Sequence, residues 1–133
     1  MELPNNEAVF SVDVEGETTF KRYDGQFTVR CVLNMGQKHA MELEKTRLLG
    51  NYSSPTEGLA GIAVIFANLR AKITDGPEWW KQSAGGSNIK DENILVELYT
   101  NLQRTETEWR QKVRDLANPP VPVENSSSAP QTT

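Results

Sequence analysis

The sequence predicts an α+β fold in which an N-terminal three-stranded antiparallel β-meander packs on three α-helices. Two observations carry this prediction. Near the N-terminus apolar and polar residues alternate, which is typical of strands with one buried face. After residue 33 the apolar residues recur at spacings of three and four, which is typical of amphipathic helices. We expect one domain at residues 1–117 and a Pro- and Ser-rich extended tail at residues 118–133.

Three extended runs make up the expected meander. They cover residues 8–14, 18–20 and 26–33. We expect tight turns at residues 15–17 and at Tyr23-Asp24-Gly25, because an Asp-Gly pair suits a hairpin that needs positive φ. The face of the third run that we expect to be buried carries Phe27, Val29, Cys31 and Leu33.

Two helices should follow. Residues 37–49 are good helix formers and precede Gly50, which fits the position just after a helix C-terminus. Residues 57–74 form the most hydrophobic helical segment, so we expect this helix at the centre of the core. Its apolar stripe consists of Leu59, Ile62, Phe66, Leu69 and Ile73.

The last helix should begin near Asn88, whose side chain suits an N-cap, and end at about residue 116. A helix of that length spans about 40 Å, which is more than a domain of this size covers. Its far end is therefore a candidate to contact a partner protein. The apolar side consists of Leu95, Leu98, Leu102, Trp109, Val113 and Leu116, and Thr105 interrupts it.

A short turn that begins at Pro77 should hold Trp79 and Trp80, which are the most distinctive local feature. Both rings can anchor this linker to the core. Alternatively, one ring is an anchor for a partner, because Trp is enriched in binding hot spots.

Composition excludes several classes of function. The net charge is −4, so a fold-wide basic footprint for nucleic acid is absent. One Cys and one His leave no internal disulfide and argue against the common zinc sites. No apolar run approaches about 18 residues, and the N-terminus lacks the features of a signal peptide. We expect no cofactor, no metal, no nucleic acid and no membrane.

Few residues are candidates for catalysis. Cys31 should be buried and inert, and His39 should lie on the surface, although a Cys–His pair is the alternative. Gly85-Gly86-Ser87 suits a mobile loop better than an anion cradle, because it lacks the spacing of a phosphate motif. The neighbouring carboxylates should lie on solvated faces. They are the pairs Asp13 and Glu15, Glu42 and Glu44, Asp91 and Glu92, and Glu106 and Glu108.

Two groups of segments resemble a known class of protein. The first is Gly25-Gln26-Phe27-Thr28-Val29-Arg30-Cys31-Val32-Leu33 with the charged helix up to Leu48-Leu49-Gly50. The second is Ala67-Asn68-Leu69-Arg70-Ala71, Pro77-Glu78-Trp79-Trp80, Asp91-Glu92-Asn93-Ile94-Leu95, Glu97-Leu98-Tyr99 and Glu108-Trp109-Arg110. Over about residues 20–114 this arrangement resembles small tailed-bacteriophage proteins encoded among the structural genes, some of which are tail assembly chaperones.

The resemblance implies a non-enzymatic protein that binds other phage structural proteins (head, neck or tail subunits) or associates with itself, in the virion or in the host cytoplasm during assembly. A chaperone would shield tail subunits until assembly, whereas a virion component would stay bound. The alternatives are a host-side adaptor or inhibitor, and a small enzyme that uses carboxylates with Tyr99 or Tyr52. The expected partner-binding residues are Trp79, Trp80, Trp109, Val113, Pro120 and Val121.

Overall fold

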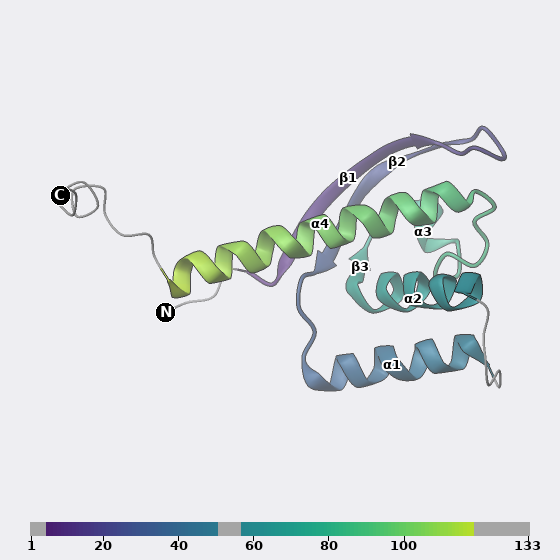
Figure 1. The fold of residues 1–133 in the computed structure, drawn as a ribbon. Helices are drawn as coiled ribbons and strands as arrows, with labels where there is room; N and C mark the ends of the chain where they lie inside the picture. The colour runs from purple at the N-terminus through teal and green to yellow at the C-terminus, as the bar shows by residue number, and fades with distance from the viewer. Residues whose placement is uncertain (1–4, 51–56, 119–133) are drawn as a thin grey trace, which may run out of the picture.

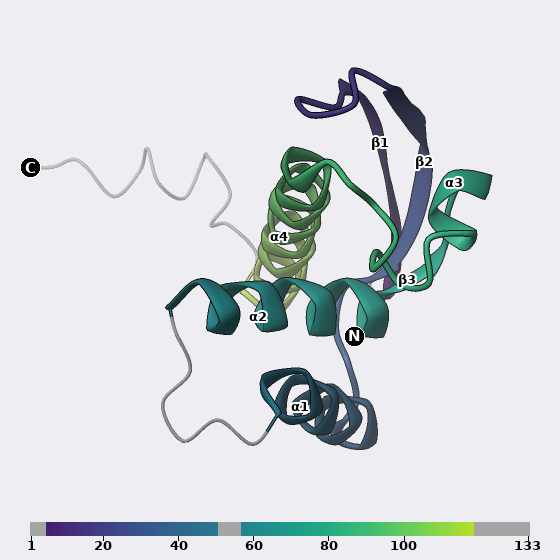
Figure 2. The same cartoon turned by 90° about the vertical axis from the view of Figure 1, so that its right-hand side faces the viewer.

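The computed structural model describes residues 5–50 and 57–118, apart from the side chains of Glu57 and Leu59. The α+β class with a three-stranded antiparallel sheet is confirmed, and the strand order is β1-β2-β3. Figures 1 and 2 show α4 packed beside the long hairpin of β1 and β2, and α2 between α4 and α1. The elements are β1 (Glu7–Glu15), β2 (Arg22–Arg30), α1 (Met35–Leu49), α2 (Glu57–Lys72), β3 (Ile73–Asp75), α3 (Glu78–Lys81) and α4 (Glu92–Ala117).

The third strand comes from a later part of the chain than the sequence predicts. Residues 17–19 form the turn of the hairpin, so the strand expected at residues 18–20 is wrong. The third strand is β3, which pairs with β2 through Thr28 and Asp75 and through Val29 and Ile73. The helix ends at Lys72, two residues before the predicted end. Ile73 and Thr74, which follow it, are β-branched, and such residues favour a strand over a helix.

The turn expected at Tyr23-Asp24-Gly25 is also wrong, because these residues lie inside β2. Gly25 has a φ of +145° and pairs with Val12. A Cβ at Gly25 would lie 2.7 Å from the Cβ of Pro77. A glycine inside a strand often marks such a close approach of another segment. The glycine therefore makes room for the segment that leads into α3.

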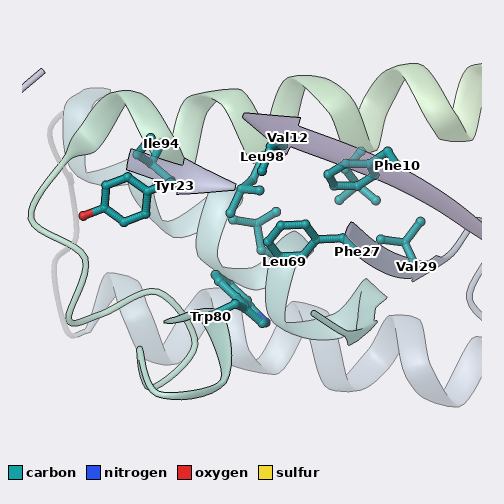
Figure 3. Packing of buried hydrophobic residues seen from close by; sticks show 10 residues of the cluster. Phe10, Val12, Tyr23, Phe27, Val29, Leu69, Trp80, Ile94 and Leu98 are labelled. Carbon is teal, nitrogen blue, oxygen red and sulfur yellow. The ribbon is translucent and has the colours of Figure 1, made fainter. Parts of the chain in front are cut away.

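The core lies between the sheet, α2 and α4, as Figure 3 shows. Phe27 is fully buried and stacks on Phe10, with ring centroids 5.4 Å apart. Leu69 from α2 and Leu98 from α4 are also fully buried. The expected buried face of Phe27, Val29, Cys31 and Leu33 is confirmed.

The first predicted helix is confirmed and begins two residues earlier, at Met35. Asn34 and Gln37 form a capping box, in which each side chain accepts a hydrogen bond from the other residue's backbone N–H. Gly50 ends the helix with a φ of +69°, as expected. None of the residues of α1 is buried, and the helix packs on α2.

The apolar stripe of α2 is only partly buried. Leu69 is fully buried, but Ile62 is 47% exposed. Ala63 and Ala67 are buried as well, and Ala67 faces α1 across a narrow hollow. Helix α2 therefore packs on the core with one side and on α1 with another, so the prediction of a single buried stripe is wrong. The side chain of Leu59 lies outside the described residues.

The last helix begins at Glu92, so the prediction of Asn88 as its N-cap is wrong. Asp91 occupies the N-cap position, but its side chain makes no capping hydrogen bond. Thr105 does not interrupt the buried side, because it is only 7% exposed and its hydroxyl donates to the carbonyl of Asn101 at 2.8 Å. A threonine can thus face the core when its own helix satisfies its hydroxyl group.

Candidate functional site

The C-terminal part of α4, residues 107–117, contains the predicted contact residues Trp109 and Val113. We call it the α4 outer end. The buried residues of α4 stop at Glu106. Beyond it Val113 is half-buried and Leu116 is 46% exposed. Figure 1 shows this end projecting past α1 and α2. The apolar side of α4 thus continues beyond the part that the core covers.

Trp109 connects the α4 outer end to the start of the chain. Its indole N–H donates to the carbonyl of Asn5 at 2.8 Å, and the side chain is half-buried. Trp109 also lines a hollow of about 350 Å³ together with Ala8, Val9 and Glu108. The ring is therefore partly held by the chain itself and partly open.

Trp79 and Trp80 both pack on Phe27. Their rings lie edge-on to the Phe27 ring, with centroids 5.5 Å and 6.0 Å away. Trp79 is half-buried and its indole N–H donates to the carbonyl of Asp24 at 2.7 Å, while Trp80 is only 8% exposed. Both indoles therefore anchor α3 to β2. Trp80 has little surface left for a partner, whereas Trp79 also lines a hollow with Lys21 and Tyr23.

The predicted contact residues do not form one surface. Figure 2 shows α3, which carries Trp79 and Trp80, on one side of β1 and β2 and α4, which carries Trp109 and Val113, on the other. Pro120 and Val121 lie outside the described residues.

A buried carboxylate that the sequence analysis placed on a solvated face organises the hairpin turn. Asp91 is completely buried. Its Oδ1 accepts from the backbone N–H groups of Thr18 and Thr19, both at 2.8 Å. Its Oδ2 accepts from the hydroxyls of Thr19 at 2.6 Å and Tyr23 at 2.7 Å. Gly16 must be a glycine, because a Cβ there would lie 2.3 Å from the Asp91 Cγ.

These hydrogen bonds fix the charge of Asp91. Burial alone would raise the pKa of its carboxyl, but the hydrogen bonds from Thr19, Tyr23 and Thr18 outweigh burial and hold the pKa well below its usual range. Burial and the hydrogen bond to Asp91 raise the pKa of Tyr23. The carboxylate therefore stays ionised and acts as a fixed acceptor for the turn.

The turn held by Asp91 presents Phe20 to solvent. Phe20 is 72% exposed and has a φ of +60°, a left-handed conformation that is rare for bulky residues. A large apolar side chain on strained backbone is a candidate contact residue. Sequence analysis missed Phe20 because it placed this residue in the strand expected at residues 18–20 and not beside the hairpin turn.

Replacing Phe20 with Asn should stabilise the protein. Asn tolerates the left-handed conformation, and the exposed ring contributes little burial, so we expect the free energy of unfolding to rise by about 0.5–1 kcal/mol. Urea unfolding measures this change. The control is Phe20→Leu, which keeps a bulky side chain on the same backbone and should bring no gain. A less stable Phe20→Asn protein would show that the ring makes favourable contacts.

A second carboxylate, Glu44, joins α1 to α2. It contacts Arg47 at 2.7 Å and Arg70 at 2.5 Å. The guanidinium groups of Arg47 and Arg70 lower the pKa of Glu44 to about 2. Arg70 also donates to the carbonyl of Gly85 and to the hydroxyl of Ser87, so it ties the Gly85-Gly86-Ser87 loop to α2. Arg70 is thus the common partner of α1 and this loop.

The expectation of solvated carboxylates is also wrong for Glu106. Its side chain is 9% exposed and lies 2.5 Å from the ammonium group of Lys72, whose side chain is 13% exposed. Asp13 and Glu42, in contrast, are exposed as expected. The buried acids that the structure describes, Asp91 and Glu106, each have partners inside the fold.

Of the candidates for catalysis, Cys31 lines a hollow together with Glu106. Cys31 is buried, and burial together with the charge of Glu106 raises the pKa of its thiol. His39 is exposed on α1, as expected. Tyr99 is half-buried against the core, and Tyr52 lies outside the described residues. Among residues 5–50 and 57–118, no three His, Cys, Asp or Glu side chains gather as metal ligands.

Comparison with known proteins found no relative of this chain. No protein-family model, curated protein or solved structure matches the chain. In the part of the chain that the structure describes, no helix has the length and apolar character needed to cross a membrane.

Proposed function

We propose that the protein is a non-enzymatic bacteriophage particle protein that binds other virion proteins during or after assembly, either as a structural component or as a tail assembly chaperone. The resemblance of residues 20–114 to small phage proteins suggests this class. The α4 outer end is the observation that carries a binding role, because it continues the apolar side of α4 beyond the core. The partners would be head, neck or tail subunits, met in the virion or in the host cytoplasm.

Binding would work through a few apolar anchors. Leu116, Val113 and the open part of Trp109 lie on one side of α4, at spacings of three and four residues. A partner groove that takes up this side would remove their apolar surface from water, and a few such residues usually dominate the binding free energy. Charged neighbours such as Arg110 and Arg114 would form the rim of this interface and favour the correct orientation of the partner.

In this proposal Trp79 and Trp80 contribute less to partner binding than the α4 outer end does. Trp80 has little free surface, and Trp79 is held by Asp24. Their packing on Phe27 favours the interpretation in which both indoles anchor the linker around α3. Pro120 and Val121 of the expected tail remain predicted contact residues.

Replacing Leu116 with Gln tests the α4 outer end. Leu116 is 46% exposed, so the folded protein should keep its stability within about 0.5 kcal/mol. Loss of one of these apolar anchors should weaken partner binding by at least about tenfold. We therefore expect Leu116→Gln to lower the yield of particles when it complements a phage that lacks its own copy of the gene.

The matched control is Leu43→Gln, because Leu43 is a 58% exposed leucine on another helix, α1. It should support a normal yield of particles. Equal yields from the wild-type protein and both variants would contradict a binding role of the α4 outer end. Leu116 is a sharper probe than Trp109, since Trp109→Ala would also break the hydrogen bond to Asn5.

A further inference from the structure

Strand β1 forms a free edge of the sheet, because the strand order is β1-β2-β3. Two hydrogen bonds show which backbone groups face β2. The N–H of Cys31 donates to the carbonyl of Asn6, and the N–H of Gly16 donates to the carbonyl of Lys21. Bonded pairs alternate along an antiparallel ladder, so the even-numbered residues of β1 bond to β2. The odd-numbered residues, 7 to 15, direct their N–H and C=O groups outward.

Side chains close this edge at both ends but not in the middle. The N–H of Glu7 donates to the Oδ1 of Asn5 at 3.0 Å. The carbonyl of Glu15 accepts from the Nδ2 of Asn93 at 3.1 Å. Between them, the outward backbone groups of Val9, Ser11 and Asp13 have no partner among the described residues. Such a regular, unprotected edge is a template for another strand.

Helix α4 packs on β1, and two hollows lie between these two elements. The first, of about 350 Å³, includes Ala8 and Trp109. The second, of about 650 Å³, includes Val14 and Val96. Ala8 and Val14 are six residues apart on the same face, which corresponds to about 20 Å along a strand. Every second side chain of an added strand would point toward this row of hollows.

Carboxylates surround the apolar parts of both hollows. Glu7 and Glu108 line the first, together with one cation, Lys112. The second contains three carboxylates and none of the basic residues. They are Glu17, Glu92 and Glu97. Lys and Arg fit such places, because their aliphatic stems cover apolar surface while their charged ends reach carboxylates.

We propose that the edge of β1 binds an extended basic segment of another protein as a fourth strand of the sheet. The segment carries Lys or Arg at two positions six residues apart, and these side chains enter the two hollows. Backbone hydrogen bonds to Val9, Ser11 and Asp13 supply affinity, and the hollows supply specificity. This contact shares Trp109 with the α4 outer end but does not use Val113 or Leu116. Leu116→Gln therefore tests the α4 outer end, and the protection of the β1 amides tests the edge, so either contact can fail while the other stands.

A second copy of the chain does not fit this edge. If two β1 strands paired antiparallel around Ser11, Glu7 of each copy would face Glu15 of the other. Like charges directly opposite each other destabilise a pair of strands. The same carboxylates attract a basic segment. Charge complementarity therefore favours a basic partner over a second copy of the chain.

The test uses the full chain and a defined probe, the capped peptide KVTVTVK, with the acidic peptide EVTVTVE as its control. Hydrogen exchange of backbone amides, followed by NMR, reports on the edge. With KVTVTVK, we expect the amides of Val9, Ser11 and Asp13 to exchange at least about tenfold more slowly, because they gain hydrogen bonds. The amides that face β2 should not change. EVTVTVE should have no effect.

Two variants keep this test decisive. Ser11→Pro removes one outward N–H, which an edge strand tolerates, whereas Ser11→Thr keeps it. We expect Ser11→Pro to abolish protection by KVTVTVK and Ser11→Thr to retain it. If Ser11→Pro does not fold, the double variant Glu92→Lys and Glu97→Lys replaces it and should lose protection by KVTVTVK.

Three results would overturn the proposal. The first is no added protection at Val9, Ser11 and Asp13 with KVTVTVK. The second is equal protection by the acidic peptide. The third is protection of these amides without any peptide, in step with a concentration-dependent dimer, since a second copy would then be the occupant.

Discussion

Replacing Asp91 with Ala should lower the melting temperature by about 10 °C or more. The substitution leaves four donors of the hairpin turn, from Thr18, Thr19 and Tyr23, without their acceptor. The bond from the Tyr23 hydroxyl is buried and the three others are partly buried, and a donor that loses its acceptor away from water is among the costliest single changes. Asp91→Asn should cost less, because the hydroxyls of Thr19 and Tyr23 can rotate and accept from the new amide. Thermal unfolding followed by circular dichroism measures both changes.

The matched control is Asp24→Ala, because Asp24 is exposed on β2 and its side chain makes none of these bonds. It should melt within a few degrees of the wild-type protein. If Asp91→Ala melted at the same temperature as Asp24→Ala, the turn would not depend on the buried carboxylate.

The same carboxylate makes stability depend on pH. The pKa of Asp91 is lower in the folded chain than in the unfolded chain, so the unfolded chain binds more protons as the pH falls. Its contribution is complete above the unfolded pKa of about 3.9 and is lost as the pH falls toward the folded pKa. Glu44, with a pKa of about 2, acts in the same direction. Below about pH 4 the wild-type protein should therefore lose stability more steeply than Asp91→Asn.

Breaking the buried pair of Lys72 and Glu106 should be the second large effect. Lys72→Met leaves a buried carboxylate without its cation, which costs about 3–5 kcal/mol. Replacing both residues, as Lys72→Met with Glu106→Leu, removes both buried charges and should bring stability back to within about 1 kcal/mol of the wild type. Urea unfolding of the two single variants and the double variant completes the cycle.

The exposed pair of Lys45 and Glu42 provides the comparison, because its members are 32% and 57% exposed. Lys45→Met should change the free energy of unfolding by less than about 1 kcal/mol. If Lys72→Met were as mild as Lys45→Met, water would reach the buried pair more freely than its burial indicates.

The sequence predicted those parts of the fold that depend on local patterns. The capping glycine Gly50 marked the end of α1, and alternation marked the buried face around Phe27. It could not predict β3, because pairing of Ile73 with Val29 joins residues far apart in the chain. The Asp24-Gly25 pair led to a wrong prediction of a turn for the same reason. A glycine is needed at position 25 because Pro77, far along the chain, packs against it.

The candidate site divides in the same way. The length of the last helix was enough to predict that its far end extends beyond the core, where Leu116 is 46% exposed, but not that Trp109 bonds to Asn5. The role of Asp91 was not visible, because its partners lie 68–73 residues earlier in the chain. Trp79 and Trp80 attracted attention as rare residues, but only their packing on Phe27 distinguishes an internal anchor from a contact surface.

Mass spectrometry of purified particles, and of infected cells, tests the proposed function most directly. If the proposal holds and the chain is a structural component, purified particles of its source should contain it at many copies. If it is a chaperone, the chain should be abundant in infected cells and absent from the particles. Absence from both, or a gene that belongs to a cell and not to a phage, would contradict the proposal and leave the host-side adaptor in its place.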